Sequence, residues 1–249
     1  MARAPSALGL GGSPLYRAIK SQITENLQSG EWGLGEAIPS ESRLAERFHV
    51  SVGTVRKAVD ELVAEKVLVR QQGKGTFVAT HNRDRTLYYF FHIVGHDETD
   101  KNYPQVELLS FKKDRAGNDA AEQLQIARGD PVFKIQNLLL LAGSPVVLDD
   151  ITIPVAPFQD LTRDIFKNRD STIYALYQSR YGINVIRSVE RLRANLADSA
   201  CNKHLGIRPG GPVLEIRRVA YTYHDTPVEL RVSRVNTTHH EYLSELSNS

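Results

Sequence analysis

The sequence predicts a two-domain α+β protein, with a small helical N-terminal domain followed by a larger domain built on an antiparallel sheet. Three observations lead to this prediction. The chain has 249 residues, enough for two domains of ordinary size. Amphipathic helical patterns dominate up to residue 63, and short β-rich segments separated by turn residues dominate from residue 87 onward. Strands that meet in hairpins, with helices to one side, are typical of an α+β domain.

Composition narrows the class of protein. Apolar residues make up 41% of the chain and charged residues 24%, close to the average for soluble globular proteins. No apolar run approaches the roughly 20 residues that cross a bilayer, and residues 1–12 lack the apolar core of a signal peptide. Cys201 is the only cysteine, which excludes an internal disulfide and a thiolate-rich zinc site. We therefore expect a cytoplasmic protein without metal or cofactor.

The first helix is expected to follow a flexible N-terminus, residues 1–13. Ser13 is a suitable N-cap and Pro14 a suitable first helical residue, while Gly30 fits a left-handed C-cap. One apolar stripe runs between them at helical spacing, formed by Tyr16, Ile19, Ile23 and Leu27.

Residues 40–63 predict a helix-turn-helix. Ser40 can cap a short helix that carries Leu44 and Phe48 on one face, and Ser51 can cap the next helix. A helix-turn-helix places the N-terminal residues of its second helix at base edges in the major groove. Residues 67–70 and 76–78 then read as two strands around a glycine-bearing tip, which is a wing. The predicted DNA-binding domain is thus residues 14–79, followed by a polar linker at residues 80–86.

DNA binding rests on where the charges lie, since the net charge of the whole chain is only +2. Small residues at the start of the second helix allow close approach to phosphate, and arginine is the commonest reader of guanine. The small, basic wing tip suits the adjacent minor groove. The alternative is an ordinary helical subdomain. The candidate DNA-binding residues are Ser40, Ser42, Arg43, Ser51, Val52, Gly53, Thr54, Arg56, Lys57, Gln72, Gly73, Lys74 and Gly75.

The larger domain is expected to span residues 87–249. Its predicted strands are residues 87–94, 132–141, 146–153, 185–192, 213–222 and 228–235, and its predicted helices are residues 119–124, 172–181 and 198–205. Asp198, Cys201 and His204 share one face of the last helix, as a nucleophile with its base would. Apolar neighbours favour a core-packing role for Cys201 instead.

The runs at residues 38–48, 50–58 and 72–78 closely resemble the winged-helix domain of the GntR family of bacterial regulators. This resemblance implies base and phosphate contacts at Ser42, Ser51, Val52, Gly53, Thr54, Arg56, Gln72 and Gly73. The chain departs from the family where Arg43 follows Ser42, and where Val52 and Gly53 follow the turn. Val52 could meet a thymine methyl group, so the operator is expected to differ from the commonest family site.

Residues 87–246 resemble the UTRA effector domain of the HutC subfamily, which shares its fold with chorismate lyase. The resemblance lies in residues 143–149, 171–176, 181–183, 205–207, 212–218 and 226–229. In sugar-phosphate-sensing relatives an Arg-x-Arg pair grips the phosphate, and this chain has Asn137 and Leu139 there. A buried phosphate without cationic partners is costly, so an unphosphorylated effector is expected.

The remaining candidate effector-binding residues are Asp149, Ser171, Glu229 and Arg231, each of which could instead lie on a surface strand. Their mixed charges suit a small zwitterionic or carboxylate metabolite, such as an amino acid. The predicted function is a ligand-responsive transcription regulator, and a repressor is favoured over an activator. It is expected to bind double-stranded operator DNA as a homodimer and not to bind a membrane. The alternative is a chorismate-lyase-like enzyme tethered to DNA, against which the missing arginine pair counts.

Overall fold

The computed structural model describes residues 14–80, 90–96 and 102–244, and the chain divides into two units, residues 1–80 and 81–249. The predicted flexible N-terminus therefore lies outside the described residues, as does the predicted linker after residue 80. Both stay predictions.

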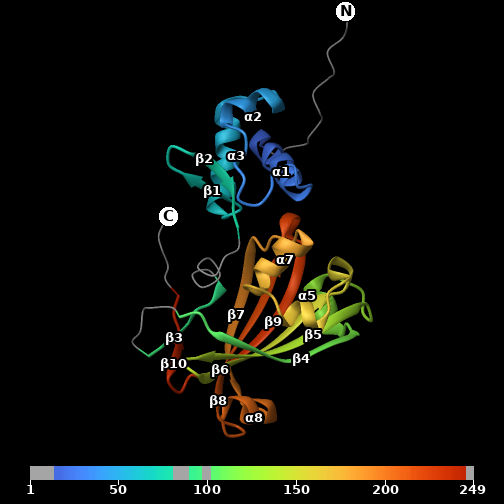
Figure 1. Ribbon diagram of the computed structural model, residues 1–249, viewed down its shortest axis with the longest axis vertical. Coiled ribbons are helices and arrows are strands. Elements are labelled where there is room, and N and C mark those ends of the chain that lie inside the picture. Colours follow the sequence, from blue (N-terminus) through green and yellow to red (C-terminus); the bar gives the residue numbers. More distant parts are fainter. Residues whose placement is uncertain (1–13, 81–89, 97–101, 245–249) are drawn as a thin grey trace, which may run out of the picture. The chain divides into compact units, whose positions relative to one another are not determined.

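The smaller unit has three helices and a two-stranded wing (Figure 1). Its elements in chain order are α1 (Leu15–Gln28), α2 (Glu41–Phe48), α3 (Val52–Ala64), β1 (Leu68–Gln71) and β2 (Gly75–Val78). The wing strands are antiparallel, with Leu68 opposite Val78. The predicted apolar stripe of α1 is buried at Ile19, Ile23 and Leu27, and α1 packs against α3. The amphipathic spacing therefore places the core of this unit as expected.

Local hydrogen bonds define the helix ends. The hydroxyl of Ser40 accepts from the backbone N–H of Arg43, and that of Ser51 accepts from the N–H of Thr54, so both predicted N-caps are confirmed. The start of α1 was predicted wrongly. Pro14 is the N-cap, with the extended dihedral angles φ −54° and ψ 137°, and its carbonyl accepts from the N–H of Arg17 at 2.9 Å. Ser13 lies outside the described residues.

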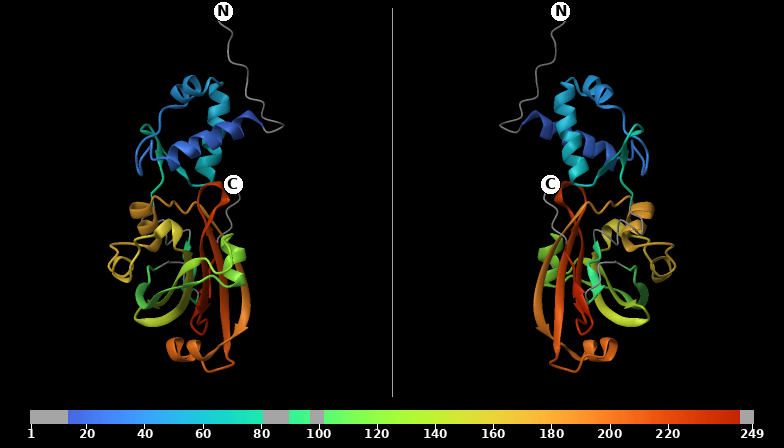
Figure 2. Two further views of the ribbon diagram at one scale, coloured as in Figure 1. Left: turned by 90° about the vertical axis from the view of Figure 1, so that its right-hand side faces the viewer. Right: turned by 90° about the vertical axis from the view of Figure 1, so that its left-hand side faces the viewer.

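The larger unit is built on a six-stranded antiparallel sheet with the strand order β4-β5-β6-β9-β8-β7, whose strands twist about one another in the side views of Figure 2. The strands are β4 (Gln105–Arg115), β5 (Pro131–Leu141), β6 (Ser144–Pro154), β7 (Arg187–Leu196), β8 (Pro212–Tyr221) and β9 (Pro227–Val235). Ala142 and Gly143 join β5 to β6, with φ of 48° and 80°. Two successive positive φ angles match the twist of a tight hairpin, which explains the glycine.

The remaining elements are helices and a small two-stranded sheet. The helices are α5 (Asn118–Leu124), α6 (Arg163–Lys167), α7 (Ile173–Tyr181) and α8 (Ser199–Leu205), with single 3₁₀ turns η1 (Ala156–Phe158) and η2 (Tyr223–Asp225). Strand β3 (Ile93–Gly95) pairs with β10 (His240–Tyr242). Of the strand predicted at residues 87–94, only Ile93 and Val94 lie in a strand. Phe90, Phe91 and His92 do not, and residues 87–89 are not described.

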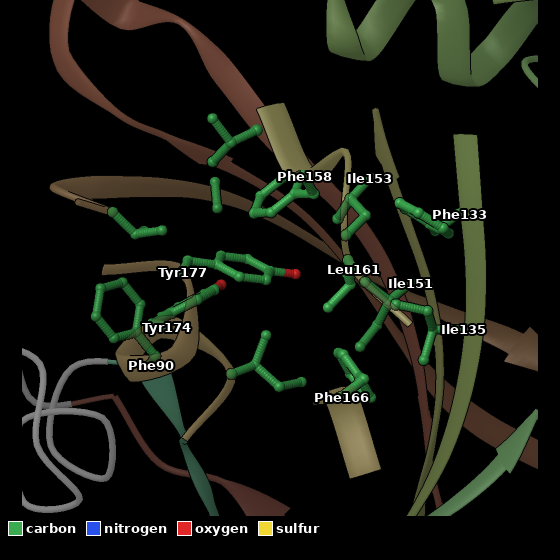
Figure 3. Close-up of a cluster of buried hydrophobic side chains, with 14 residues drawn as sticks. Phe90, Phe133, Ile135, Ile151, Ile153, Phe158, Leu161, Phe166, Tyr174 and Tyr177 are labelled. Atoms are coloured by element: carbon green, nitrogen blue, oxygen red, sulfur yellow. The ribbon is translucent and has the colours of Figure 1, made fainter. Parts of the chain in front are cut away.

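Helices pack against both faces of the sheet. Along β6, Leu148 packs with Cys201 of α8, whereas Ile151 and Ile153 point to the other face and pack with Tyr177 of α7 (Figure 3). This alternation follows from the two-residue period of a strand. Cys201 is fully buried, which confirms its core-packing interpretation.

Candidate DNA interface and effector cavity

The start of α3 forms an exposed surface of small residues. Ser51, Val52 and Gly53 are exposed, Thr54 is half-buried, and the hydroxyls of Ser51 and Thr54 lie 2.8 Å apart. A Cβ atom added at Gly53 would meet only the Ser51 hydroxyl, at 3.8 Å. The first turn of α3 therefore leaves room for a phosphate or a base edge beside its free N–H groups.

The two predicted cations of α3 are held in different ways. Arg56 donates to the carboxylate of Glu41 on α2 at 2.8 Å, and Arg70 of the wing donates to the same carboxylate at 3.1 Å. The Lys57 ammonium instead lies 4.2 Å from the centre of the Tyr16 ring of α1. Glu41 thus ties Arg56 to the wing, while Lys57 is drawn toward α1. Arg56 is nevertheless 61% exposed.

The wing tip is a tight turn made of exposed residues. The N–H of Lys74 donates to the carbonyl of Gln71 at 3.0 Å, and Gly73 and Gly75 have φ of 72° and 122°. Gln72 and Lys74 are both exposed, as are Ser40, Ser42 and Arg43 at the start of α2. The smaller unit therefore leaves every predicted DNA-binding side chain at least partly open to solvent.

A cavity that is partly open to solvent lies within the larger unit. Its floor comes from the sheet face that carries α7, and its walls come from the segment before β3, the residues that enter β4, and the start of α7. The lining residues are Phe90, Phe91, Tyr103, Pro104, Val106, Asn137, Leu139, Asp149, Arg169, Thr172, Ile173, Tyr174, Arg218 and Arg231.

Strand register aligns the polar and charged side chains of this floor. Asn137 lies opposite Asp149, which lies opposite Ser233, and Arg231 lies opposite Arg218. Asp149 accepts from Arg231 at 3.1 Å and from the Ser233 hydroxyl at 2.5 Å. Four strands therefore bring these side chains to one place, although the sequence separates them widely.

Glu229 holds the cavity residue Arg231 in place without lining the cavity itself. It is fully buried and accepts from the hydroxyls of Tyr174 and Tyr177, at 3.1 and 2.8 Å, and from Arg231 Nε at 3.0 Å. Burial lowers the pKa of Arg231, but the carboxylates of Glu229 and Asp149 outweigh it and hold that pKa well above its usual value. Arg231 is thus a fixed cation with two carboxylate partners.

Arg218 connects the cavity to the chain segment before β3. It donates to Glu190 at 2.6 Å and also to the backbone carbonyl of Phe90. The Phe90 ring meets Tyr174 edge to face, with 4.8 Å between the ring centres. Phe90 is therefore held by α7 on one side and by the sheet on the other.

Four of the predicted effector residues, Asn137, Leu139, Asp149 and Arg231, line this cavity. Two do not. Glu229 binds Arg231 without lining the cavity itself, and Ser171 borders a separate hollow together with Asn168 and Arg180. The neighbour of Ser171, Thr172, lines the cavity in its place.

Arg169 and Arg218 also line the cavity, so it holds two guanidinium groups besides Arg231 that the sequence did not single out. Residues outside the Arg-x-Arg positions supply the guanidinium groups. Both arginines lie in or beside segments that resemble the UTRA domain: Arg169 comes two residues before segment 171–176, and Arg218 is the last residue of segment 212–218. Only the tertiary structure shows that both side chains line one cavity, because strand register places Arg218 and the packing of the loop between α6 and α7 places Arg169.

Comparisons with known proteins agree with this architecture. Residues 15–78 match the family model described as bacterial regulatory proteins, gntR family, and residues 100–241 match the UTRA domain model. Among the described residues, no helix is long and apolar enough to cross a membrane.

Two curated relatives and one solved structure are similar over most of their length. The mannosyl-D-glycerate transport/metabolism system repressor of Escherichia coli is 31% identical, with 83% of this chain and 85% of the relative covered. The histidine utilization repressor of Pseudomonas putida is 29% identical, with 85% and 84% covered. The ligand-binding domain of a Bordetella bronchiseptica protein assigned to the GntR-family regulators is 29% identical, with a TM-score of 0.58, covering 63% of this chain and 96% of that one.

Proposed function

The chain belongs to the GntR family of bacterial transcription regulators, in the group that carries a UTRA effector domain, and we propose that a metabolite bound in its sheet cavity controls its affinity for operator DNA. Its family and its curated relatives are regulators and not enzymes. The alternative of an enzyme tethered to DNA therefore has no support. The missing arginine pair does not itself exclude an enzyme, because other arginines line the cavity.

The observation that carries this proposal is the side chain of Asn137. It is fully buried and lines the cavity, yet neither its amide nitrogen nor its amide oxygen has a hydrogen-bond partner among the described residues. A buried polar group without a partner costs about 1–3 kcal/mol. A ligand that bonds to Asn137 would remove this cost, so the cavity is suited to a polar occupant.

The path by which an occupant would act on DNA binding starts at Phe90 and Phe91. Both line the cavity, and they directly follow residues 81–89, through which the sheet domain connects to the winged helix. A ligand that displaces the Phe90 ring or competes for Arg218 would change how Phe90 is held against the sheet and α7. Such a ligand shifts the equilibrium only as far as it favours one arrangement of the protein over another.

The proposal includes a cytoplasmic homodimer and an unphosphorylated carboxylate or amino-acid-like effector. A winged helix covers one half-site, and a two-fold dimer reads two. The two relatives above are named for mannosyl-D-glycerate and histidine, both of which carry a carboxylate.

The test begins with an operator selected from random-sequence DNA by repeated rounds of binding. Metabolites are screened by thermal shift, and operator affinity is then measured by fluorescence anisotropy with and without each stabilising compound. We expect a change of about 5- to 150-fold, and the operator must change the metabolite's affinity by the same factor. A saturating metabolite that leaves operator affinity unchanged, or that the protein converts into a product, would contradict the proposal.

A further inference from the structure

Resting on the proposed function, we propose that Arg169 recognises the anionic group of the effector and that this group is a single carboxylate. Arg169 lies in the loop between α6 and α7 and lines the sheet cavity. This assignment identifies a specificity residue in a loop, outside the strand β5 that contributes Asn137 and Leu139 to the same cavity.

Arg169 differs from the other two arginines of the cavity because it has no carboxylate partner among the described residues. Its Nη1 donates to the carbonyl of Phe166 at 2.6 Å, its guanidinium carbon lies 4.7 Å from the centre of the Phe166 ring, and its buried Nε has no partner. Burial lowers the pKa of Arg169. A desolvated cation with an unused donor is most stable when an anion completes its contacts.

Two further features beside Arg169 favour an anion. The nine-residue helix α7 begins at this cavity, since Thr172, its N-cap, and its first two residues, Ile173 and Tyr174, all line the wall. The N-terminus of a helix carries partial positive charge and free N–H groups. Independently of the helix, Asn137 offers a buried amide with two unused donors and an unused acceptor.

The charges of the cavity decide between a carboxylate and a phosphate. Arg231 is paired with Asp149 and Glu229, and Arg218 is paired with Glu190, so Arg169 is the lining arginine left uncompensated. A carboxylate supplies one negative charge and fits the planar fork of a guanidinium. A phosphate near pH 7 carries more than one charge, and the excess would lie in a cavity that Asp149 also lines. Asp149 instead suits a hydroxyl or ammonium group elsewhere on the effector.

The test uses the full chain, without DNA, and acetate as the probe. The side-chain Nε–H signals of the arginines are followed by ¹H–¹⁵N NMR at constant ionic strength during titration with sodium acetate, acetamide or inorganic phosphate. The Arg169 signal is identified by its loss in both Arg169→Lys and Arg169→Gln. Arg180→Lys is the matched control, because Arg180 is an exposed arginine nearby that is paired with Asp160.

We expect the Arg169 signal to shift with acetate until it saturates, and to remain unchanged with acetamide at the same concentrations. Phosphate should bind at least several-fold more weakly than acetate. No saturable shift with acetate would overturn the assignment of Arg169, and tighter binding of phosphate would overturn the choice of a carboxylate. If Arg169 does not bind acetate, the proposal that a metabolite controls operator affinity still stands. If the protein binds acetate but no metabolite changes its operator affinity, only the proposed function is refuted.

Discussion

Truncation of Glu229 should destabilise the larger unit while leaving the smaller one folded. Glu229→Ala removes the acceptor of three donors, the hydroxyls of Tyr174 and Tyr177 and the guanidinium of Arg231, in a place with no solvent access. Breaking one partner of a buried ion pair costs about 3–5 kcal/mol. The Tyr177 hydroxyl, which loses its carboxylate acceptor, adds about 1–3 kcal/mol, although such costs do not add fully. We therefore expect a loss of at least about 3 kcal/mol.

Urea unfolding measures this loss, and the chain provides a separate probe for each unit. Trp32 is the single tryptophan and is buried in the smaller unit, so its fluorescence follows that unit. Near-ultraviolet circular dichroism follows the tyrosines, most of which lie in the larger unit. Glu229→Ala should lower the midpoint of the tyrosine transition and leave the tryptophan transition in place.

Two variants serve as controls for this measurement. Glu229→Gln keeps the shape and one acceptor oxygen, so it should lie between the wild type and Glu229→Ala. Asp160→Asn, which breaks an exposed pair with Arg180, should change the midpoint little. A loss below about 1 kcal/mol in Glu229→Ala would show that this carboxylate is not the anchor of Arg231 and the two tyrosines.

Three further predictions concern the DNA interface and the buried tyrosines. Arg56→Ala should weaken operator binding roughly 5- to 150-fold in gel-shift titrations, with the fold intact; unchanged affinity would remove Arg56 from the base-reading residues. Lys74→Ala should weaken binding to all sequences and reduce the slope of log affinity against log salt by about one; lost discrimination with an unchanged slope would contradict this. Burial raises the pKa of Tyr174 to about 12, above the ordinary value of 10.0, so its stabilising contribution is complete below pH 10 and is lost as the pH rises toward 12. Tyr174→Phe should therefore flatten the fall of unfolding free energy above pH 10, and an equally steep fall would show that other groups cause it.

The features that the sequence predicted well depend on contacts close along the chain. Ser40 and Ser51 bond to N–H groups three residues onward, and α1 is recognisable from one apolar stripe. The hairpin at Ala142 and Gly143 is likewise a local matter of backbone geometry. Strand β4 was missed because it is an edge strand, mostly exposed, with an irregularity between Leu108 and Ser110 that breaks the two-residue period.

The sequence by itself thus determined the two-domain α+β plan, the helix-turn-helix with its wing, and a set of candidate DNA-binding residues that are open to solvent. The tertiary structure alone decided which residues line the sheet cavity. Ser171 and its neighbour Thr172 border different hollows, and Glu229 binds Arg231 without lining the cavity itself. Arg169 and Arg218 were recognisable only after folding, because whether an arginine is paired depends on strand register and on a loop packed over the sheet. These contacts join residues far apart in the chain, and no local pattern records them.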